Sequence, residues 1–350
     1  ALPEATAMLF MRPGQPHEPV AVPQVLLAPG EVLVETEFAT VCGSDVHTVL
    51  GRRSEATPLV LGHEIAGTVE KIGAGVKGLK PGDRVAVSHH VPCGSCRYCL
   101  KGHETACETL RKTNFFPGGF AEFVRVPAIN IEKGGVYQVP DNVTFEEATF
   151  IEPLACVLRG QRIAGVKKGD TVLVIGSGIS GLLHVKYARA SGAGVIAATD
   201  LSKYRLDAAA RFGADRAFNA AEWAPQKLKD INNGMLADVV IICAGAAPAI
   251  QQGLDSVERG GTVLFFAASE KGLTVNKPIN DIFWRNEVTL TSSYAATPAE
   301  HLEAMRLLGS GKVAVKDMIT HRFGIAEAGE GFRLVAEAQD SIKVIINPHS

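Results

Sequence analysis

The stretch Asp170-Thr-Val-Leu-Val-Ile175-Gly176-Ser177-Gly178-Ile179-Ser180-Gly181 decides the fold of the second half of the chain. The run ending at Ile175 is apolar, as in a parallel strand buried on both faces. The glycine-rich turn then opens a helical stretch, 182–191, and a second strand, 194–199, follows. In this context the glycines permit a tight turn and a close backbone approach, while the helix N-terminus receives a pyrophosphate. Residues Gly176–Gly181 are therefore predicted to bind a dinucleotide.

Asp200 ends the second strand, about 20 positions beyond the glycine-rich turn. There its carboxylate can hydrogen-bond both ribose hydroxyls of an adenosine, and it would repel a 2′-phosphate. The residue thus favours NAD over NADP. Lys203 and Arg205 follow and could soften that repulsion at the cofactor, although we favour the alternative that they lie on a solvated helix face.

Strands and helices keep alternating after Asp200, which predicts an α/β doubly wound parallel sheet with right-handed crossovers. The expected elements are helices 203–212 and 225–230 and strands 214–218, 237–242 and 261–266, with a further helix before the last strand. Ligands bind outside the carboxyl ends of such strands. Ala244, Gly245 and Ala267 follow two of these strands and are predicted to line the nicotinamide pocket.

Four of the seven cysteines fall within fifteen positions, at Cys93, Cys96, Cys99 and Cys107. Spacings of this kind let tight turns gather four thiolates around one tetrahedral zinc ion. A disulfide framework does not fit a chain without an export signal. A ferredoxin-type cluster would need a fourth cysteine after three residues and then proline. The pattern predicts a structural zinc site, which has no open position for a substrate.

The first half of the chain also contains ligands for an open metal site. Cys42, His63 and Glu64 supply a thiolate, an imidazole and a carboxylate, a donor set suited to a catalytic zinc. Taken singly, each has an ordinary alternative, such as a buried cysteine or a hydrogen-bonded histidine. Asp45 is placed to orient His63 through its other ring nitrogen.

Two polar residues close to Cys42 suggest a route for a proton. Ser44 and His47 lie within about a turn of that cysteine. They could pass a proton from a buried alcohol to solvent.

Composition describes an ordinary soluble protein. The 350 residues suffice for two domains with full cores. The formal charge of -2 argues against nucleic acid or an anionic membrane as the main partner. No apolar run approaches the roughly 20 residues of a membrane span, and 1–12 lacks the pattern of a signal peptide. We expect a reducing, cytoplasmic environment.

The first 150 or so residues are rich in short strands punctuated by glycine and proline. Alternating or apolar runs predict strands at 31–38 and 60–72 and after the Pro81-Gly82 turn. No long helical period interrupts them. This region is expected to form a compact, β-barrel-like domain from which the four-cysteine lobe projects.

The block Cys42-Gly-Ser-Asp-Val-His47, the block Gly62-His63-Glu64 and the four-cysteine lobe, in this order, resemble the zinc-dependent medium-chain alcohol/polyol dehydrogenases, particularly the sorbitol dehydrogenase-like branch. The resemblance implies two zinc ions per chain, one catalytic and one structural. Glu152 matches the family's Glu-Pro-Leu segment and would either ligate the catalytic zinc or hold its water. The family varies over which carboxylate, Glu64 or Glu152, binds directly. A plain alternative for Glu152 is a carboxylate stabilised by a helix dipole.

The resemblance covers nearly the whole chain and implies its organisation. A GroES-like β-rich catalytic domain would span 1–156, carry the zinc lobe 93–107 and be completed by 292–350. A Rossmann NAD-binding domain would span 157–291, with the active site between the domains. The resemblance also implies a homodimer or a homotetramer.

The implied activity is interconversion of a secondary alcohol, of polyol, sugar-alcohol or cyclitol type, and its ketone by hydride transfer to or from NAD. Zinc would lower the pKa of the substrate hydroxyl, and the proton would leave through Ser44 and His47 or the cofactor ribose. Where the sorbitol dehydrogenase-like branch carries an Arg-Tyr pair, this sequence reads Tyr294-Ala295-Ala296, which puts sorbitol itself in doubt.

Three alternatives follow. An L-threonine 3-dehydrogenase-like enzyme would share the fold and oxidise an amino alcohol. A zinc-free reductase of the superfamily would lack Cys42 and His63. A non-catalytic zinc module or NAD-sensing scaffold would give Cys42, His63, Glu64 and Glu152 no joint reason to exist.

Overall fold

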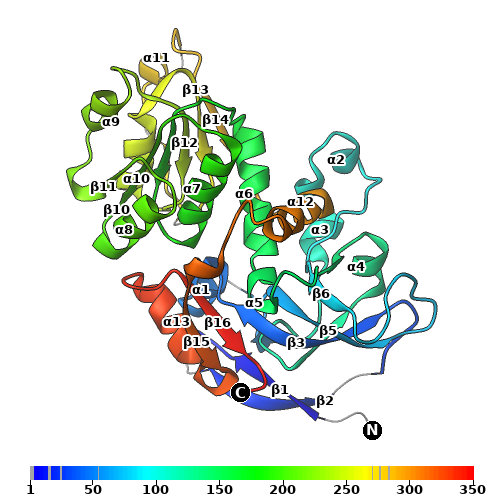
Figure 1. Cartoon of the computed structure of the whole chain (residues 1–350). Coiled ribbons are helices and arrows are strands. Elements are labelled where there is room, and N and C mark those ends of the chain that lie inside the picture. The colour runs from blue at the N-terminus through cyan, green and yellow to red at the C-terminus, as the bar shows by residue number, and fades with distance from the viewer. Residues whose placement is uncertain are drawn as a thin grey trace. The chain divides into compact units, whose positions relative to one another are not determined.

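The computed structural model describes residues 4–14, 17–23, 26–53, 55–269, 271–275, 277–282 and 284–350. The chain forms two compact units (Figure 1). Unit 1 comprises Ala1–Ala155, Ala295–Glu337 and Ser341–Ser350, and unit 2 comprises Cys156–Tyr294 and Ala338–Asp340. The division falls within helix α6 (Ile151–Ala164). Within the described residues, no helix combines the length and apolar character that a membrane span requires.

Unit 2 is built on a six-stranded parallel sheet in the order β11-β10-β9-β12-β13-β14. Its strands are β9 (Val172–Ile175), β10 (Ile196–Asp200), β11 (Arg216–Asn219), β12 (Ala237–Ile242), β13 (Val257–Phe265) and β14 (Thr289–Ser292). All four residues of β9 are buried, as expected for a central parallel strand. The order changes direction at β9, where a doubly wound sheet binds its ligand. The predicted Rossmann-type sheet is confirmed.

Helices cover this sheet (Figure 1). They are α7 (Ile179–Ser191), α8 (Lys203–Arg211), α9 (Pro225–Ile231), α10 (Ala247–Leu254) and the short α11 (Ile279–Ile282). The first two pack against β9, β10 and β11, whereas α10 packs against β12 and β13. Right-handed crossovers in opposite directions from β9 place these two groups on opposite faces. Strand β13 begins earlier than predicted, because Val257 already pairs with Ala237 before a shift of register.

Unit 1 contains a seven-stranded and a three-stranded sheet, and its β-rich, GroES-like character is confirmed. The larger sheet has the order β15-β16-β3-β5-β6-β8, with β7 also paired to β3. Its strands are β3 (Val32–Thr40), β5 (Glu64–Ile72), β6 (Arg84–Val87), β7 (Phe123–Val126), β8 (Val136–Gln138), β15 (Ile319–Gly324) and β16 (Lys343–Asn347). The smaller sheet contains β1 (Glu4–Phe10), β2 (Glu18–Pro23) and β4 (Leu59–Val60). The C-terminal strand β16 pairs with β3, so residues from both ends of the chain share one sheet.

Helices of unit 1 before residue 150 are short, as the sequence predicted. They are α1 (Gly43–Val49), α2 (Arg97–Leu100), α3 (Glu108–Lys112), α4 (Ala128–Glu132) and α5 (Phe145–Ala148); α12 (Pro298–Gly309) and α13 (Ala328–Glu337) come later. The core holds alternate residues of the strands, including Val32, Val34, Ile65 and Val85, with Phe120. These buried side chains fix the register of β3 against β5, and that register sets Thr40 opposite Glu64.

Candidate active site and metal centres

The predicted ligands of the open site come together where two strands meet. Antiparallel pairing sets Thr40, the last residue of β3, opposite Glu64, the first residue of β5. Cys42 follows β3 and His63 precedes β5, so both lie beside this pair. The ligand atoms of Cys42, His63 and Glu64 all lie within 4.8 Å of one another. A thiolate, an imidazole and a carboxylate at such separations fit a zinc ion that keeps one position open.

Asp45, in the first turn of α1, organises this site. Its Oδ2 accepts from the backbone N–H of Cys42 at 3.0 Å, and its Oδ1 accepts from that of Gly62 at 3.4 Å. Its Oδ1 also lies 3.4 Å from Nδ1 of His63. The predicted contact between Asp45 and His63 is thus present, and it leaves Nε2 of the imidazole to face a metal.

Charges around His63 shift its affinity for protons. Burial acts to lower the pKa of His63, but the Asp45 carboxylate and the Cys42 thiolate outweigh burial and raise that pKa well above its usual value. The same two anionic groups favour any cation at this point, so zinc and the proton compete for the imidazole.

Gly62 allows the chain to turn into His63. Its φ of +95° is in the left-handed region, and a Cβ there would lie 2.9 Å from the backbone nitrogen of Phe120. A larger residue would suffer both backbone strain and a clash. The glycine of the Gly62-His63-Glu64 block therefore positions the imidazole.

Glu64 has partners that the sequence interpretation missed. Its Oε2 accepts from the Thr40 hydroxyl and from the Lys343 ammonium group, and all three side chains are buried. Both contacts use Oε2, so Oε1 is the oxygen that a metal could take. A lone lysine inside the apolar run Ile342-Lys-Val-Ile-Ile346 was the available signal, because a buried charge needs a buried partner.

The remaining candidates for proton transfer lie on α1 and α6. Ser44 and His47 are both half-buried on α1. Burial, then the nearby Arg52 and Arg53, lowers the pKa of His47, which keeps the imidazole neutral and able to accept a proton at pH 7.

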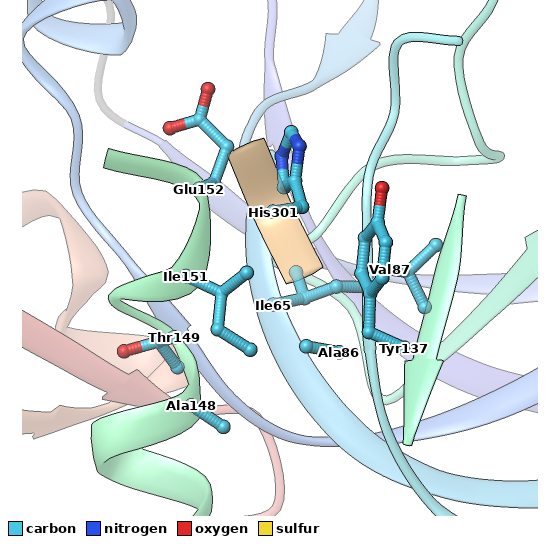
Figure 2. A pocket seen from close by; sticks show the side chains of 9 residues that line it. All are labelled: Ile65, Ala86, Val87, Tyr137, Ala148, Thr149, Ile151, Glu152 and His301. Atoms are coloured by element: carbon cyan, nitrogen blue, oxygen red, sulfur yellow. The ribbon is translucent and has the colours of Figure 1, made fainter. Parts of the chain in front are cut away.

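Glu152 lies in the first turn of α6 and lines a small cavity with His301 (Figure 2). Within the described residues it is not part of the Cys42, His63 and Glu64 group.

His89 also belongs to this neighbourhood and was missed. Its ring centroid lies 4.8 Å from that of His63 and 3.7 Å from that of His90. Burial, followed by the neighbouring imidazoles, lowers the pKa of His89 well below its usual value. The imidazole of His89 therefore stays neutral beside His63, a candidate metal ligand. The His-His pair just before Cys93 was the only local hint.

The four-cysteine lobe has the geometry of a closed zinc site. Sγ of Cys99 lies 3.9 Å from Sγ of Cys93 and 3.6 Å from Sγ of Cys96. A tetrahedron with zinc–sulfur bonds of about 2.3 Å requires sulfur–sulfur separations of about 3.8 Å. The N–H groups of Ser95 and Cys96 lower the pKa of Cys93 to about 5, so this thiol ionises readily. All four cysteines are free thiols, and Cys107 is buried.

The glycine-rich turn in unit 2 is closely packed. A Cβ on Gly181 would lie 1.8 Å from the carbonyl oxygen of Gly176, so the helix can approach the turn only with glycine there. Asp200 accepts from the N–H of Ser177 at 2.7 Å and from that of Ser202 at 2.8 Å. Its carboxylate is thereby held beside the turn. Gly178, Ile179 and Ser180 lead from the turn into the first residues of α7.

The two basic residues after Asp200 behave differently. Lys203 pairs with Asp207 at 2.7 Å on an exposed face of α8, as the favoured interpretation held. Arg205 does not fit that interpretation, because its side chain is partly buried rather than solvated. Burial lowers the pKa of Arg205, with Asp200 opposing the effect. Its Nη1 lies 3.8 Å from where a Cβ of Gly178 would be, next to the glycine-rich turn.

Ala244, one of the strand-end residues predicted for the nicotinamide pocket, lies close to the turn. A Cβ on Gly176 would come within 3.0 Å of the Cβ of Ala244. A Cβ on Gly245 would come within 2.1 Å of the Ala268 carbonyl oxygen, next to Ala267. Burial raises the pKa of Cys243, as expected for a packing residue.

Two family models match the chain. The alcohol dehydrogenase GroES-like domain matches residues 28–141, and the zinc-binding dehydrogenase model matches residues 180–310. Together the two matches span well over half of the chain. They occur in the order of the two structural units.

Individual proteins are similar over most of their length. Sorbitol dehydrogenase of Homo sapiens is 34% identical over 316 residues, which cover 87% of this chain and 85% of that protein. Sorbitol dehydrogenase of Halalkalibacterium halodurans is 32% identical over 326 residues, which cover 91% and 92%. A chain described as a zinc-binding dehydrogenase of Sinorhizobium meliloti 1021, bound to NADP, has a TM-score of 0.88 at 28% identity and covers 99% of this chain and 100% of its own.

Proposed function

Because the chain belongs to the zinc-dependent medium-chain alcohol/polyol dehydrogenase family, we propose that it interconverts a polyol, sugar alcohol or cyclitol and the corresponding ketone, with NAD as hydride carrier. The observation that carries the proposal is the convergence of Cys42, His63 and Glu64 within 4.8 Å. Unit 1 then supplies the catalytic centre and unit 2 the cofactor site, with boundaries close to 1–156 plus 292–350 and 157–291.

Cys42 and His63 hold the catalytic zinc in this proposal. Glu64 or Glu152 provides the carboxylate, either as a ligand or as the acceptor for a bound water. Zinc, when bound, acts as a Lewis acid that lowers the pKa of the substrate hydroxyl. Asp45 holds the His63 ring in the orientation that ligation needs, and the buried Lys343 balances the charge of Glu64.

The proton of the substrate hydroxyl leaves through Ser44 and His47. The neutral imidazole of His47 can accept it, and the half-buried position of the ring gives it a way to solvent. Ser44 lies one turn earlier on α1 and passes the proton on. The cofactor ribose is the alternative relay.

The Gly176–Gly181 turn and the first turn of α7 bind the pyrophosphate of the cofactor, with Ala244, Gly245 and Ala267 near the nicotinamide. Asp200, held by Ser177 and Ser202, accepts from the ribose hydroxyls and disfavours a 2′-phosphate. Arg205 lies close enough to the turn to reach the cofactor. NAD is therefore the proposed cofactor, although the Sinorhizobium meliloti structure holds NADP.

Cys93, Cys96, Cys99 and Cys107 hold the second zinc, whose role is to stabilise their lobe. We further propose a homodimer or homotetramer in the cytoplasm, as for the family that the sequence resembles. The Homo sapiens and Halalkalibacterium halodurans relatives are named for the polyol sorbitol, which favours a polyol over an amino alcohol as the substrate. The Tyr294-Ala295-Ala296 sequence makes a polyol other than sorbitol the better candidate.

The experiment measures zinc per chain in the wild type and in Cys42→Ala, together with NAD reduction on polyols, polyol phosphates, cyclitols and threonine. We expect two zinc ions falling to one, with activity lost, and turnover on a polyol-type substrate. One zinc in the wild type, unchanged in the variant even after zinc is added back, would contradict the catalytic centre. Turnover of threonine alone would contradict the substrate class.

A further inference from the structure

Unit 1 contains a cavity of about 10 Å³ beside the first turn of α6. That volume corresponds to a single water molecule. The polar residues lining it are Tyr137, Thr149, Glu152 and His301, and the rest of the lining is apolar. Figure 2 shows the polar ends of Glu152, His301 and Tyr137 on one side and the aliphatic side chains, such as Ile151 and Ile65, on the other.

His301 lines this cavity, and its ring carries a hydrogen-bond acceptor. Its Nδ1 lies 2.8 Å from the Thr297 carbonyl oxygen. A carbonyl oxygen can only accept, so Nδ1 carries the proton and Nε2 has a lone pair. Burial lowers the pKa of His301 to about 4, so the ring is neutral at pH 7.

Within the described part of the chain, this acceptor has no protein partner. His301 is only 3% exposed, and within the described residues no donor reaches its buried Nε2. The Thr149 hydroxyl does not serve, because it donates to the Glu146 carbonyl oxygen at 2.7 Å. Nearly all buried polar atoms find a partner, often an ordered water, so this one calls for a donor in the cavity.

We propose that one ordered water fills this cavity, donates to Nε2 of His301 and to the carboxylate of Glu152, and accepts from the Tyr137 hydroxyl. His301 is then a positioning residue that holds Glu152 in place through the water. The proposal rests on the function proposed above, in which Glu152 serves the catalytic zinc. The proposal requires only that the His301 ring is neutral and accepts a hydrogen bond at Nε2.

Tyr137 is suited to donate the third hydrogen bond of the proposed water. Its ring stacks on that of His301 with centroids 5.1 Å apart and an interplanar angle of 2°. Burial, followed by the Glu300 carboxylate, raises the pKa of Tyr137, so its hydroxyl keeps its proton and can donate. The stacked rings also limit the rotation of His301.

His184, on α7, is a matched control. It too is fully buried, and no hydrogen-bond partner for its Nε2 is found within the described residues. However, the Gln161 amide lies 3.2 Å from its Nδ1 and donates to it, so Nε2 carries the proton. Its ring meets Phe266 edge to face at 4.5 Å, where an aromatic face can receive an N–H. This histidine needs no water and does not line the cavity.

The test compares the zinc-loaded wild type with His301→Leu, His301→Gln and His184→Leu. A crystal structure of the wild type is expected to show one water within hydrogen-bond distance of Nε2 of His301 and of Glu152. We expect His301→Leu to keep its zinc content but to lose about 10-fold in kcat, as when a group that orients a metal ligand is removed. His301→Gln, which retains an acceptor, should recover most of kcat, and His184→Leu should retain wild-type kcat.

A cavity without water, an unchanged kcat in His301→Leu, or equal losses in the leucine and glutamine variants would each overturn the proposal. If His301→Leu does not fold, the wild-type density and the glutamine variant decide. The water in the crystal is independent of turnover. A wild type without zinc-dependent activity would therefore refute the proposed function while leaving the cavity water to be judged by itself.

Discussion

Lys343 donates from its ammonium group to Oε2 of Glu64, and the side chains are 0% and 1% exposed. The two residues are 279 positions apart and meet because β16 and β5 both pair with β3. The Thr40 hydroxyl donates to the same oxygen. The Glu64 carboxylate, at the candidate metal site, thus has its counter-charge within the protein core, whether or not it ligates zinc.

Lys343→Met should destabilise the protein strongly, because Glu64 would remain buried without its counter-charge. We expect the free energy of unfolding to fall by about 3–5 kcal/mol in a denaturant titration. The double variant Lys343→Met/Glu64→Gln removes both charges and should recover much of the loss. Lys203→Met, which breaks an exposed pair, should cost less than about 1 kcal/mol. Equal losses in the two lysine variants would contradict the role assigned to the pair.

Asp45→Asn should weaken zinc at the open site, because the amide holds the His63 ring less firmly and lacks the negative charge. The expected loss is about 10–100-fold in zinc affinity, measured by competition with a chelator. Asp83→Asn is the matched control, since Asp83 caps the backbone N–H of Lys80 at an exposed turn. Wild-type zinc affinity in Asp45→Asn would show that the 3.4 Å contact does not support ligation.

Cys96→Ser should remove zinc from the four-cysteine lobe and leave the other site loaded. The serine oxygen is a poor replacement for a thiolate, and the remaining three sulfurs no longer close the tetrahedron. Zinc per chain, measured by elemental analysis, is expected to drop by one. Cys243→Ala changes a cysteine outside both ligand groups and should keep the full zinc content. A full zinc complement in Cys96→Ser would refute the structural site.

Asp200→Ser should shift cofactor preference toward NADP. Removing the carboxylate deletes a repulsion that, at about 4 Å, is worth roughly 1–4 kcal/mol between unit charges near a protein surface. The ratio of kcat/KM for NADP to that for NAD is therefore expected to rise at least about 10-fold. Asp207→Asn, on the exposed face of the following helix α8, should leave the ratio unchanged. A wild type that already prefers NADP would contradict the role given to Asp200.

Stability should fall on acidification because of buried neutral histidines, and His184 isolates the effect. Burial lowers the pKa of His184 from 6.5 to about 3. The unfolded chain therefore binds a proton that the folded protein does not, so this contribution is complete above pH 6.5 and is lost as the pH falls toward 3. For one proton, the free energy of unfolding changes by about 1.4 kcal/mol per pH unit. In urea titrations, the free energy of unfolding of His184→Gln should depend on pH less steeply than that of the wild type, by this amount. Parallel pH profiles of the two proteins would contradict the prediction.

Local sequence determined much of the fold and of both candidate zinc centres. The strand–turn–helix at 170–191 depends on residues close in the chain, and so does the spacing from Cys93 to Cys107. Such patterns can be recognised in the sequence because the residues that form a turn, or that alternate between buried and exposed positions, lie within a few positions of one another. Cys42 and His63 needed the joint resemblance, since a lone cysteine or histidine indicates little.

Tertiary structure alone decided the partners of those residues. Nothing near Glu64 in the sequence indicates Lys343, and nothing near Glu152 indicates His301. Arg205 is partly buried beside the glycine-rich turn because of how α8 packs, which its local sequence did not show. Such contacts depend on strand register and helix docking between distant segments, and these are set by the packing of the whole core rather than by any local pattern.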